Sequence, residues 1–184
     1  IVDYIVQNTL GEILKNKNVE KIKNLKILDP ACGSGSFLIS AYSTLIEYWQ
    51  KHKFNSHHFD EGQLSKLEKG FKNKGKFDLS SPHKQRILLN NVYGVDLDEE
   101  AAELARLNLL SKMVGRRAKL PNIDQNIAVG NSLIDDPKIS DKAFDWQKSF
   151  PEVFRQGGFD VIIGNPPYGV LFEKEERDFL SSHY

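Results

Sequence analysis

The sequence predicts an α/β fold in which helices flank a mostly parallel sheet. Four short apolar runs each end in polar or glycine-rich residues, and the segments between them are long enough to hold crossover helices. The four runs are residues 25–28, 92–95, 127–129 and 160–163. Carboxyl ends of parallel strands meet at one edge, where open α/β sheets bind ligands. We therefore expect the functional residues directly after these runs.

The first apolar run leads into a glycine-rich turn, DPACGSGSF, at residues 29–37. A helix over residues 2–14 is expected before it, and an apolar helix over residues 37–50 after it. Glycines let the backbone approach a ligand, and a helix N-terminus favours anionic or strongly polar groups. The spacing is not G-x-G-x-x-G, because the third residue after Gly35 is Leu38. This favours a nucleoside site other than a dinucleotide pyrophosphate site.

Carboxylates follow the second run, which a helix over residues 82–90 precedes. Asp96 ends the run and is the candidate to accept hydrogen bonds from a ribose diol. The acidic residues 98–100 are expected to begin the next helix, over residues 99–112, by capping it and opposing its dipole. Gly130, Asn131 and Ser132 follow the third run in the same way.

The fourth run ends at Asn165-Pro166-Pro167-Tyr168, and a last helix is expected over residues 174–182. Two adjacent prolines end a strand, because each lacks an N–H and the first restricts the residue before it. The Asn165 amide and the Pro166 carbonyl offer two acceptors, and Tyr168 offers a ring for stacking. This set suits a planar amine; the alternative is a proline turn with a capping asparagine.

Length and composition indicate one ordinary domain: 184 residues, 40% hydrophobic, 27% charged, with zero formal net charge and a pI near 7.1. No run is long enough to span a membrane and no secretory signal opens the sequence, so we expect a cytoplasmic protein. Because Cys32 is the single cysteine, an internal disulfide is excluded. It lies beside glycines, and we expect it to serve as a small packing residue.

Residues 51–90 form a basic insertion, with nine Lys or Arg against four Asp or Glu. We expect a solvated insertion; the alternative is a DNA-contacting surface. Histidines gather in it without carboxylates or cysteines at ligand spacing, so no metal site is predicted.

The chain resembles the catalytic core of S-adenosylmethionine-dependent N6-adenine DNA methyltransferases, and more narrowly that of fused type II restriction-modification enzymes. Residues 29–37 resemble their cofactor loop, and residues 165–168 (NPPY) their catalytic motif. Matching segments also occur at residues 93–96 (YGVD), 130–133 (GNSL) and 150–154 (FPEVF). The resemblance implies a Rossmann-like methyltransferase fold, truncated after its fourth strand.

The resemblance also assigns roles to matching positions. It places Asp29, Ala31, Cys32, Gly33 and Gly35 at the methionine part of the cofactor S-adenosylmethionine. It implies that Asp96 binds the ribose, that Leu97 lies against the adenine ring, and that Asn131 and Ser132 read the adenine. Asn165 and the Pro166 carbonyl would accept hydrogens of the target N6 amine, next to Pro167, and Tyr168 would stack on the flipped base.

We therefore expect residues 1–184 to be part of a methyltransferase catalytic domain, with a cofactor loop at 27–42, an insertion at about 51–90 and a catalytic motif at 160–169. We expect target-recognition and nuclease domains to be absent from this sequence. Double-stranded DNA would then be bound mostly by regions outside it, and we expect weak cofactor affinity and no unaided site-specific methylation. No oligomeric state is predicted. The alternatives are a protein glutamine N5-methyltransferase, an RNA methyltransferase, and a non-catalytic remnant that binds cofactor.

Overall fold

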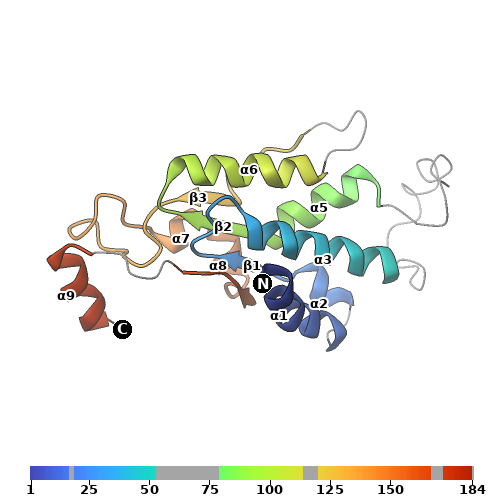
Figure 1. Cartoon of the computed structure of the whole chain (residues 1–184), viewed down its shortest axis with the longest axis horizontal. Helices are drawn as coiled ribbons and strands as arrows, with labels where there is room; N and C mark the ends of the chain where they lie inside the picture. The colour runs from blue at the N-terminus through green and yellow to red at the C-terminus, as the bar shows by residue number, and fades with distance from the viewer. Residues whose placement is uncertain (17–18, 53–78, 114–119, 167–171, 184) are drawn as a thin grey trace.

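The computed structural model describes residues 1–16, 19–52, 79–113, 120–166 and 172–183 (Figure 1). Its centre is a four-stranded parallel sheet in the order β3-β2-β1-β4. The strands are β1 (Ile27–Asp29), β2 (Val92–Asp96), β3 (Ile127–Val129) and β4 (Val161–Ile162). This confirms the predicted α/β fold with a parallel sheet.

The long helices occur in the expected order along the chain. The described helices are α1 (Val2–Asn16), α2 (Val19–Lys23), α3 (Ser36–His52), α5 (Ser81–Asn91), α6 (Glu99–Met113), α7 (Trp146–Ser149), α8 (Pro151–Arg155) and α9 (Lys174–His183). The five long helices confirm the sequence prediction to within two residues at each end. The short helices α2, α7 and α8 were not predicted. None of the described helices combines the length and the apolar character needed to cross a membrane.

Each face of the sheet has its own apolar cluster, because successive strand residues point to opposite faces. Ile27 and Val92 belong to the large cluster, which includes buried residues of α1, α3, α5 and α6. Leu28 and Tyr93 belong to a smaller, aromatic cluster with buried residues of the 144–153 segment. In Figure 1, α3, α5 and α6 accordingly lie together, with α1 beside α3.

The chain changes direction between β1 and β4. From β1 it runs outward through β2 to β3, and then returns to place β4 on the other side of β1. Such a switch leaves a crevice at the carboxyl ends of the two strands. β4 is the end strand of the described sheet, and its Ile162 is 66% exposed.

Two buried asparagines join the elements at the amino ends of the strands. The Asn91 side-chain amide donates hydrogen bonds to backbone carbonyls before β1, the shortest to Leu25 at 2.7 Å. The Asn126 amide donates to three carbonyls around the start of β2, the shortest to Val92 at 2.8 Å. This end of the sheet is thus fixed by satisfied polar groups, and the opposite end carries the loops of interest.

Helices α3 and α5 flank the segment 53–78, and they pack against each other. The Tyr42 hydroxyl of α3 donates to the Lys84 carbonyl of α5 at 3.0 Å. The predicted character of the basic insertion concerns mostly residues outside the described ranges and stays a prediction.

Candidate functional site

A cavity of about 620 Å³ lies at the carboxyl ends of the strands. Its volume is typical of small-molecule sites, which run from about 300 to 1,000 Å³. Seven residues of the predicted site line it: Ala31, Asp96, Leu97, Asn131, Ser132, Asn165 and Pro166. The loops after all four strands therefore contribute to one cavity, as the sequence predicted.

Other predicted residues lie elsewhere. Asp29, Cys32, Gly33 and Gly35 belong to the glycine-rich loop but are not part of the described lining. Pro167 and Tyr168 lie outside the described residues. Six lining residues were not predicted as site residues: Pro30, Asp98, Gly130, Leu133, Lys142 and Phe172.

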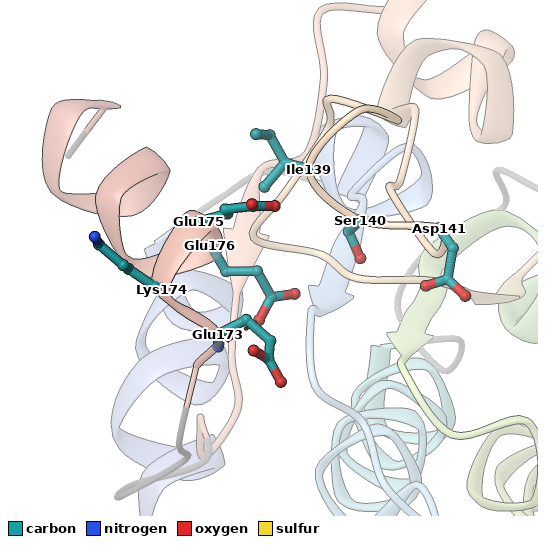
Figure 2. A pocket seen from close by; sticks show the side chains of 7 residues that line it. All are labelled: Ile139, Ser140, Asp141, Glu173, Lys174, Glu175 and Glu176. Atoms are coloured by element: carbon teal, nitrogen blue, oxygen red, sulfur yellow. Dashed lines mark hydrogen bonds between the residues drawn. The ribbon is translucent and has the colours of Figure 1, made fainter.

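A second cavity, of about 340 Å³, lies between the start of α9 and the 139–141 loop (Figure 2). Its charged lining is mostly acidic, with Asp141, Glu173, Glu175 and Glu176, and Lys174 is directed away from the hollow. Among the described residues, no group of three or more His, Cys, Asp or Glu is arranged to hold a metal ion.

The glycine-rich loop is held against α6. Gly33 and Gly35 have φ values of 51° and 87°, which side chains other than glycine rarely adopt. A Cβ on Gly35 would lie 3.2 Å from the Ala105 Cβ of α6, so the loop packs directly on that helix. The Asn108 side chain of α6 also donates to the Ser34 carbonyl at 3.0 Å. The loop geometry therefore depends on α6 as well as on its own glycines.

The Asp96 carboxylate joins two loops. Its Oδ2 accepts the Gly33 N–H at 2.6 Å, and its Oδ1 accepts the Asp98 N–H at 3.0 Å. Each carboxylate oxygen has a second lone pair, so these bonds leave room for a ribose hydroxyl at the cavity. Its predicted ribose contact is compatible with this geometry and stays a prediction.

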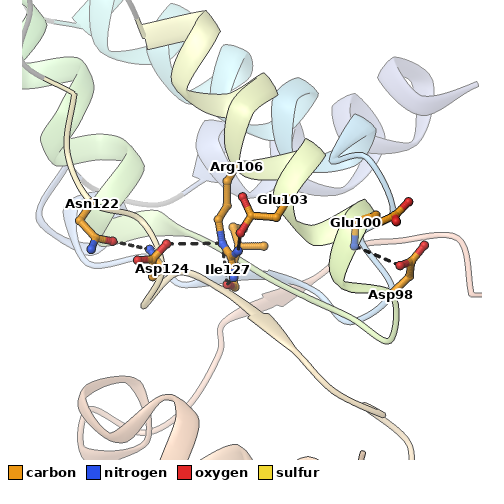
Figure 3. A network of polar contacts seen from close by, with 7 residues as sticks. All are labelled: Asp98, Glu100, Glu103, Arg106, Asn122, Asp124 and Ile127. Atoms are coloured by element: carbon orange, nitrogen blue, oxygen red, sulfur yellow. Dashed lines mark hydrogen bonds and ion pairs between the residues drawn. The ribbon is translucent and has the colours of Figure 1, made fainter.

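Asp98 begins α6, as the sequence predicted. Its Oδ1 accepts the Glu100 N–H at 3.0 Å (Figure 3). Further along the helix, Arg106 donates to the Ile127 carbonyl at 2.6 Å and also pairs with Glu103. These contacts fix α6, and with it the glycine-rich loop, against β3.

Asp29 ends β1 as a buried carboxylate, only 1% exposed. Its Oδ1 accepts the Ala31 N–H at 3.1 Å, whereas its Oδ2 has no hydrogen-bond partner. Burial raises the pKa of Asp29 from 3.8 to about 6; the Ala31 N–H opposes this and the charge of Asp96 adds to it. A carboxylate with a buried, unpaired oxygen fits a cationic group brought beside it.

Cys32 is buried in the loop, and its N–H donates to the Val95 carbonyl at 2.9 Å. Burial, followed by the charges of Asp29 and Asp96, raises the pKa of the thiol to about 12. The protonated thiol packs closely: a Cβ on Gly94 would lie 3.1 Å from its Sγ. This supports the expected role as a small packing residue.

The orientation of the Asn131 amide follows from its neighbours. Its Oδ1 lies 3.1 Å from the Leu133 backbone nitrogen, which can only donate. The amide oxygen is therefore already engaged, and Nδ2 is left as a donor. The Asn131 N–H donates to the Lys142 carbonyl at 2.7 Å, which ties the two ends of the 131–142 loop together.

The fourth loop brings the predicted catalytic motif to the same cavity. Ile163 N–H donates to the Leu28 carbonyl at 2.9 Å, which continues the pairing of β4 with β1. Gly164 follows, next to Asp29 and Pro30, and the exposed Asn165 and Pro166 line the cavity. The importance of Gly164 was missed, although a glycine at a strand end signals close backbone approach.

The strand order, the glycine-rich loop after β1 and the carboxylate that ends β2 define an open α/β domain with a ligand site at the carboxyl ends of its strands. More narrowly, the chain belongs to the Eco57I restriction-modification methylase family, whose model matches residues 90–184. A second family model, described as "RMKL-like, methyltransferase domain", matches residues 18–129. Together the two matches include all four strands.

Individual relatives agree with this assignment. The chain is 35% identical over 182 residues to the type II restriction enzyme and methyltransferase RM.Eco57I of Escherichia coli, covering 91% of this chain and 17% of the relative. It is 24% identical over 200 aligned positions to the adenine-specific methyltransferase PglX of Streptomyces coelicolor, and this match covers 95% of this chain and 14% of PglX. The chain thus spans less than a fifth of the length of these relatives.

The fold is also similar to a solved structure, the ATP-dependent Type ISP restriction-modification enzyme LlaBIII bound to DNA. The TM-score is 0.57 at 18% sequence identity, and the match covers 95% of this chain and 10% of that one.

Proposed function

We propose that this chain transfers a methyl group from S-adenosylmethionine to the N6 amine of adenine in DNA, as the methyltransferase part of a restriction-modification enzyme. One observation carries the proposal: Asn165 and Pro166 share a cavity with Ala31 and Asp96, the matching positions of the cofactor motifs. Membership of the Eco57I family supports the same activity, as do its relatives, a type II restriction enzyme and methyltransferase and an adenine-specific methyltransferase.

The residues present fit the cofactor. The unpaired Oδ2 of Asp29 suits the cationic amino-acid part, and the left-handed glycines allow the loop backbone to come close. Asp96 would hold the ribose, while Leu97, Asn131 and Ser132 would surround the base. When bound, S-adenosylmethionine supplies an electrophilic methyl group on a sulfonium.

Asn165 and Pro166 would act on the target amine. An adenine amine is a poor nucleophile, because its lone pair is delocalised into the ring. Two fixed carbonyl oxygens that accept its hydrogens favour a tetrahedral nitrogen and stabilise the positive charge that grows as the methyl group arrives. The adenine would have to leave the DNA stack to reach them. Tyr168, outside the described residues, is proposed to stack on the flipped base.

The test separates cofactor binding from methyl transfer by means of Asn165→Ala. Calorimetry of this chain with S-adenosylhomocysteine measures binding. Tritium transfer from labelled S-adenosylmethionine to DNA measures activity, and this second assay uses the protein encoded by the complete open reading frame. We expect Asn165→Ala to abolish transfer and to leave the Kd within about twofold. The control is Asn122→Ala, at an exposed asparagine in the loop before β3, and it should leave both binding and transfer unchanged.

Product analysis distinguishes the alternatives. N6-methyladenine in the digested DNA supports the proposal, and label found only in RNA or protein overturns it in favour of an RNA or a glutamine methyltransferase. Cofactor binding without label in any of the three substrates would instead indicate a non-catalytic remnant. Loss of binding in Asn165→Ala would contradict the role given to that residue.

A further inference from the structure

We propose that Lys142 is a positioning residue that fixes the wall of the cavity against which the cofactor's adenine lies, and that it thereby contributes to recognition of that base. This rests on the proposed use of S-adenosylmethionine. Lys142 lies in the loop after β3, and no sequence motif distinguishes it.

The loop that carries Lys142 is closed at its base. The Asn131 N–H donates to the Lys142 carbonyl at 2.7 Å, and the Phe144 N–H donates to the Ile134 carbonyl at 2.8 Å. Phe144 is 4% exposed and packs under Gly130, where a Cβ would lie 2.5 Å from its ring. Lys142 therefore extends from a fixed point of the backbone, with a buried aromatic anchor two residues away.

The side chain of Lys142 connects this loop to the one after β2. Its Nζ donates to the Leu97 carbonyl at 3.2 Å. Leu97 follows Asp96 directly, its side chain is 49% exposed, and it lines the cavity. The amine thus holds the backbone of the residue whose side chain is expected to lie against the adenine ring.

Charge favours the same arrangement. Lys142 is the one cation among the described residues that line the cavity, and Asp96 and Asp98 are the two anions. An ammonium group bonded to the Leu97 carbonyl, in a cavity that two carboxylates also line, favours the conformation in which the two loops approach each other.

The two loops carry opposite parts of the proposed base site. Leu97 is on one, and the Asn131 amide, whose Nδ2 is left as a donor, is on the other. Lys142 bonds to both, through its Nζ and through its carbonyl. Removing the amine would release the Leu97 backbone, so the distance between an apolar wall and a hydrogen-bonding edge would no longer be fixed. Discrimination between similar bases should then fall more than overall stability.

The experiment compares three variants with two probes. Lys142→Met keeps most of the apolar stem and removes the donor, Lys142→Arg restores a donor, and Lys138→Met is the control from the same loop. Calorimetry measures the Kd for S-adenosylhomocysteine and for S-inosylhomocysteine, in which the exocyclic amine is replaced by a carbonyl. Thermal melting reports whether each variant is folded.

We expect wild type to prefer the adenosyl probe. Lys142→Met should weaken binding of the adenosyl probe by roughly 5- to 10-fold, as expected for loss of one charge-assisted hydrogen bond at an exposed site. It should also reduce the preference for the adenosyl over the inosyl probe. Lys142→Arg should recover at least half of both effects on a logarithmic scale. Lys138→Met should stay within about twofold of wild type.

Three outcomes would overturn the proposal and leave the cofactor assignment intact. The first is a Lys142→Met variant whose Kd values match those of Lys138→Met. The others are an equal loss of affinity for both probes in Lys142→Met, and a wild type that binds the two probes equally well. Failure of wild type to bind either probe at any concentration tested would instead contradict the proposed function.

Discussion

A Cβ on Gly164 would lie 2.6 Å from the Asp29 Oδ1 and 3.3 Å from its Cγ. Asp29 ends β1, and Gly164 comes two residues after the neighbouring strand β4, at the point where the sheet changes direction. The backbone just before Asn165 therefore touches the buried carboxylate at the start of the glycine-rich loop. The two halves of the candidate site are coupled by direct contact.

Gly164→Ala should destabilise the chain by roughly 1–3 kcal/mol, because the new methyl group meets a carboxylate that is itself buried and cannot move aside. Urea unfolding measures the free-energy change. Gly11→Ala is the matched control: the nearest atom to its Cβ is the end of the flexible Gln7 side chain, so a neutral effect or a gain of up to about 1 kcal/mol is expected. Equal effects of the two substitutions would contradict the close approach at Gly164.

The raised pKa of Asp29 makes stability depend on pH. The native pKa is about 6 and the unfolded value 3.8, so between these values the native state binds more protons. Stability contributed by this group is therefore present at low pH and is lost as pH rises, by about 2 kcal/mol between pH 4.5 and 7. Asp29→Asn should remove this component, and urea unfolding of both proteins across that range measures the difference. Parallel profiles would mean that Asp29 does not titrate in this way.

Cofactor affinity should change with pH in the opposite direction. A cationic group beside Asp29 binds the ionised carboxylate better, so binding should strengthen as pH rises through about 6. Calorimetry with S-adenosylhomocysteine, which has an ammonium group, measures the profile. In Asp29→Asn we expect weaker binding at pH 7 and a flatter profile; an unchanged profile would remove Asp29 from the ligand site.

Cys32 should resist alkylation in the folded chain. Burial and a pKa raised to about 12 leave almost no accessible thiolate near pH 8. Because it is the one cysteine of the sequence, mass spectrometry after iodoacetamide reports on it alone. We expect at least a hundredfold faster labelling in urea than in buffer. Rapid labelling of the folded chain would place the thiol at the surface.

Asn126→Asp should be strongly destabilising, by roughly 2–4 kcal/mol, because it replaces a buried donor to three carbonyls with an acceptor. Asn122→Asp provides the control, since the exposed Asn122 uses its oxygen to accept the Asp124 N–H and a carboxylate can do the same. Thermal melting of the two variants measures the contrast. A mild effect at Asn126 would mean that its amide does not fix the start of β2.

The sequence was sufficient to predict the strands and the long helices. Each apolar run is followed closely by a glycine, proline or carboxylate, and the strand ends near that residue. The short helices α7 and α8 were not predicted, because four or five residues are too few to show a helical periodicity of apolar residues. Local signals were nevertheless present: Asp145 caps α7 by accepting the Lys148 N–H, and Pro151 begins α8.

The part of the candidate site that could be predicted consists of residues at or directly after the carboxyl ends of strands. Asp96 and Asn165 are expected at one edge in any parallel sheet of this order, and the structure places them around one cavity. Lys142 and Gly164 depend on how loops distant in sequence fold against each other. The Lys142 contact with Leu97 joins positions 45 residues apart, and no local pattern encodes that pairing.

The contact between α3 and α5 has a consequence for how relatives of this chain can differ in length. The Tyr42 hydroxyl and the Lys84 carbonyl meet across residues 53–78. The entropic cost of joining two fixed points by a flexible connection grows only with the logarithm of its length, about 0.6 kcal/mol for each doubling. Insertions or deletions there should leave the strand ends, and so the cavity, nearly unchanged. We therefore expect a change of length between α3 and α5 to disturb the candidate site less than a change of length in the loops that follow the strands.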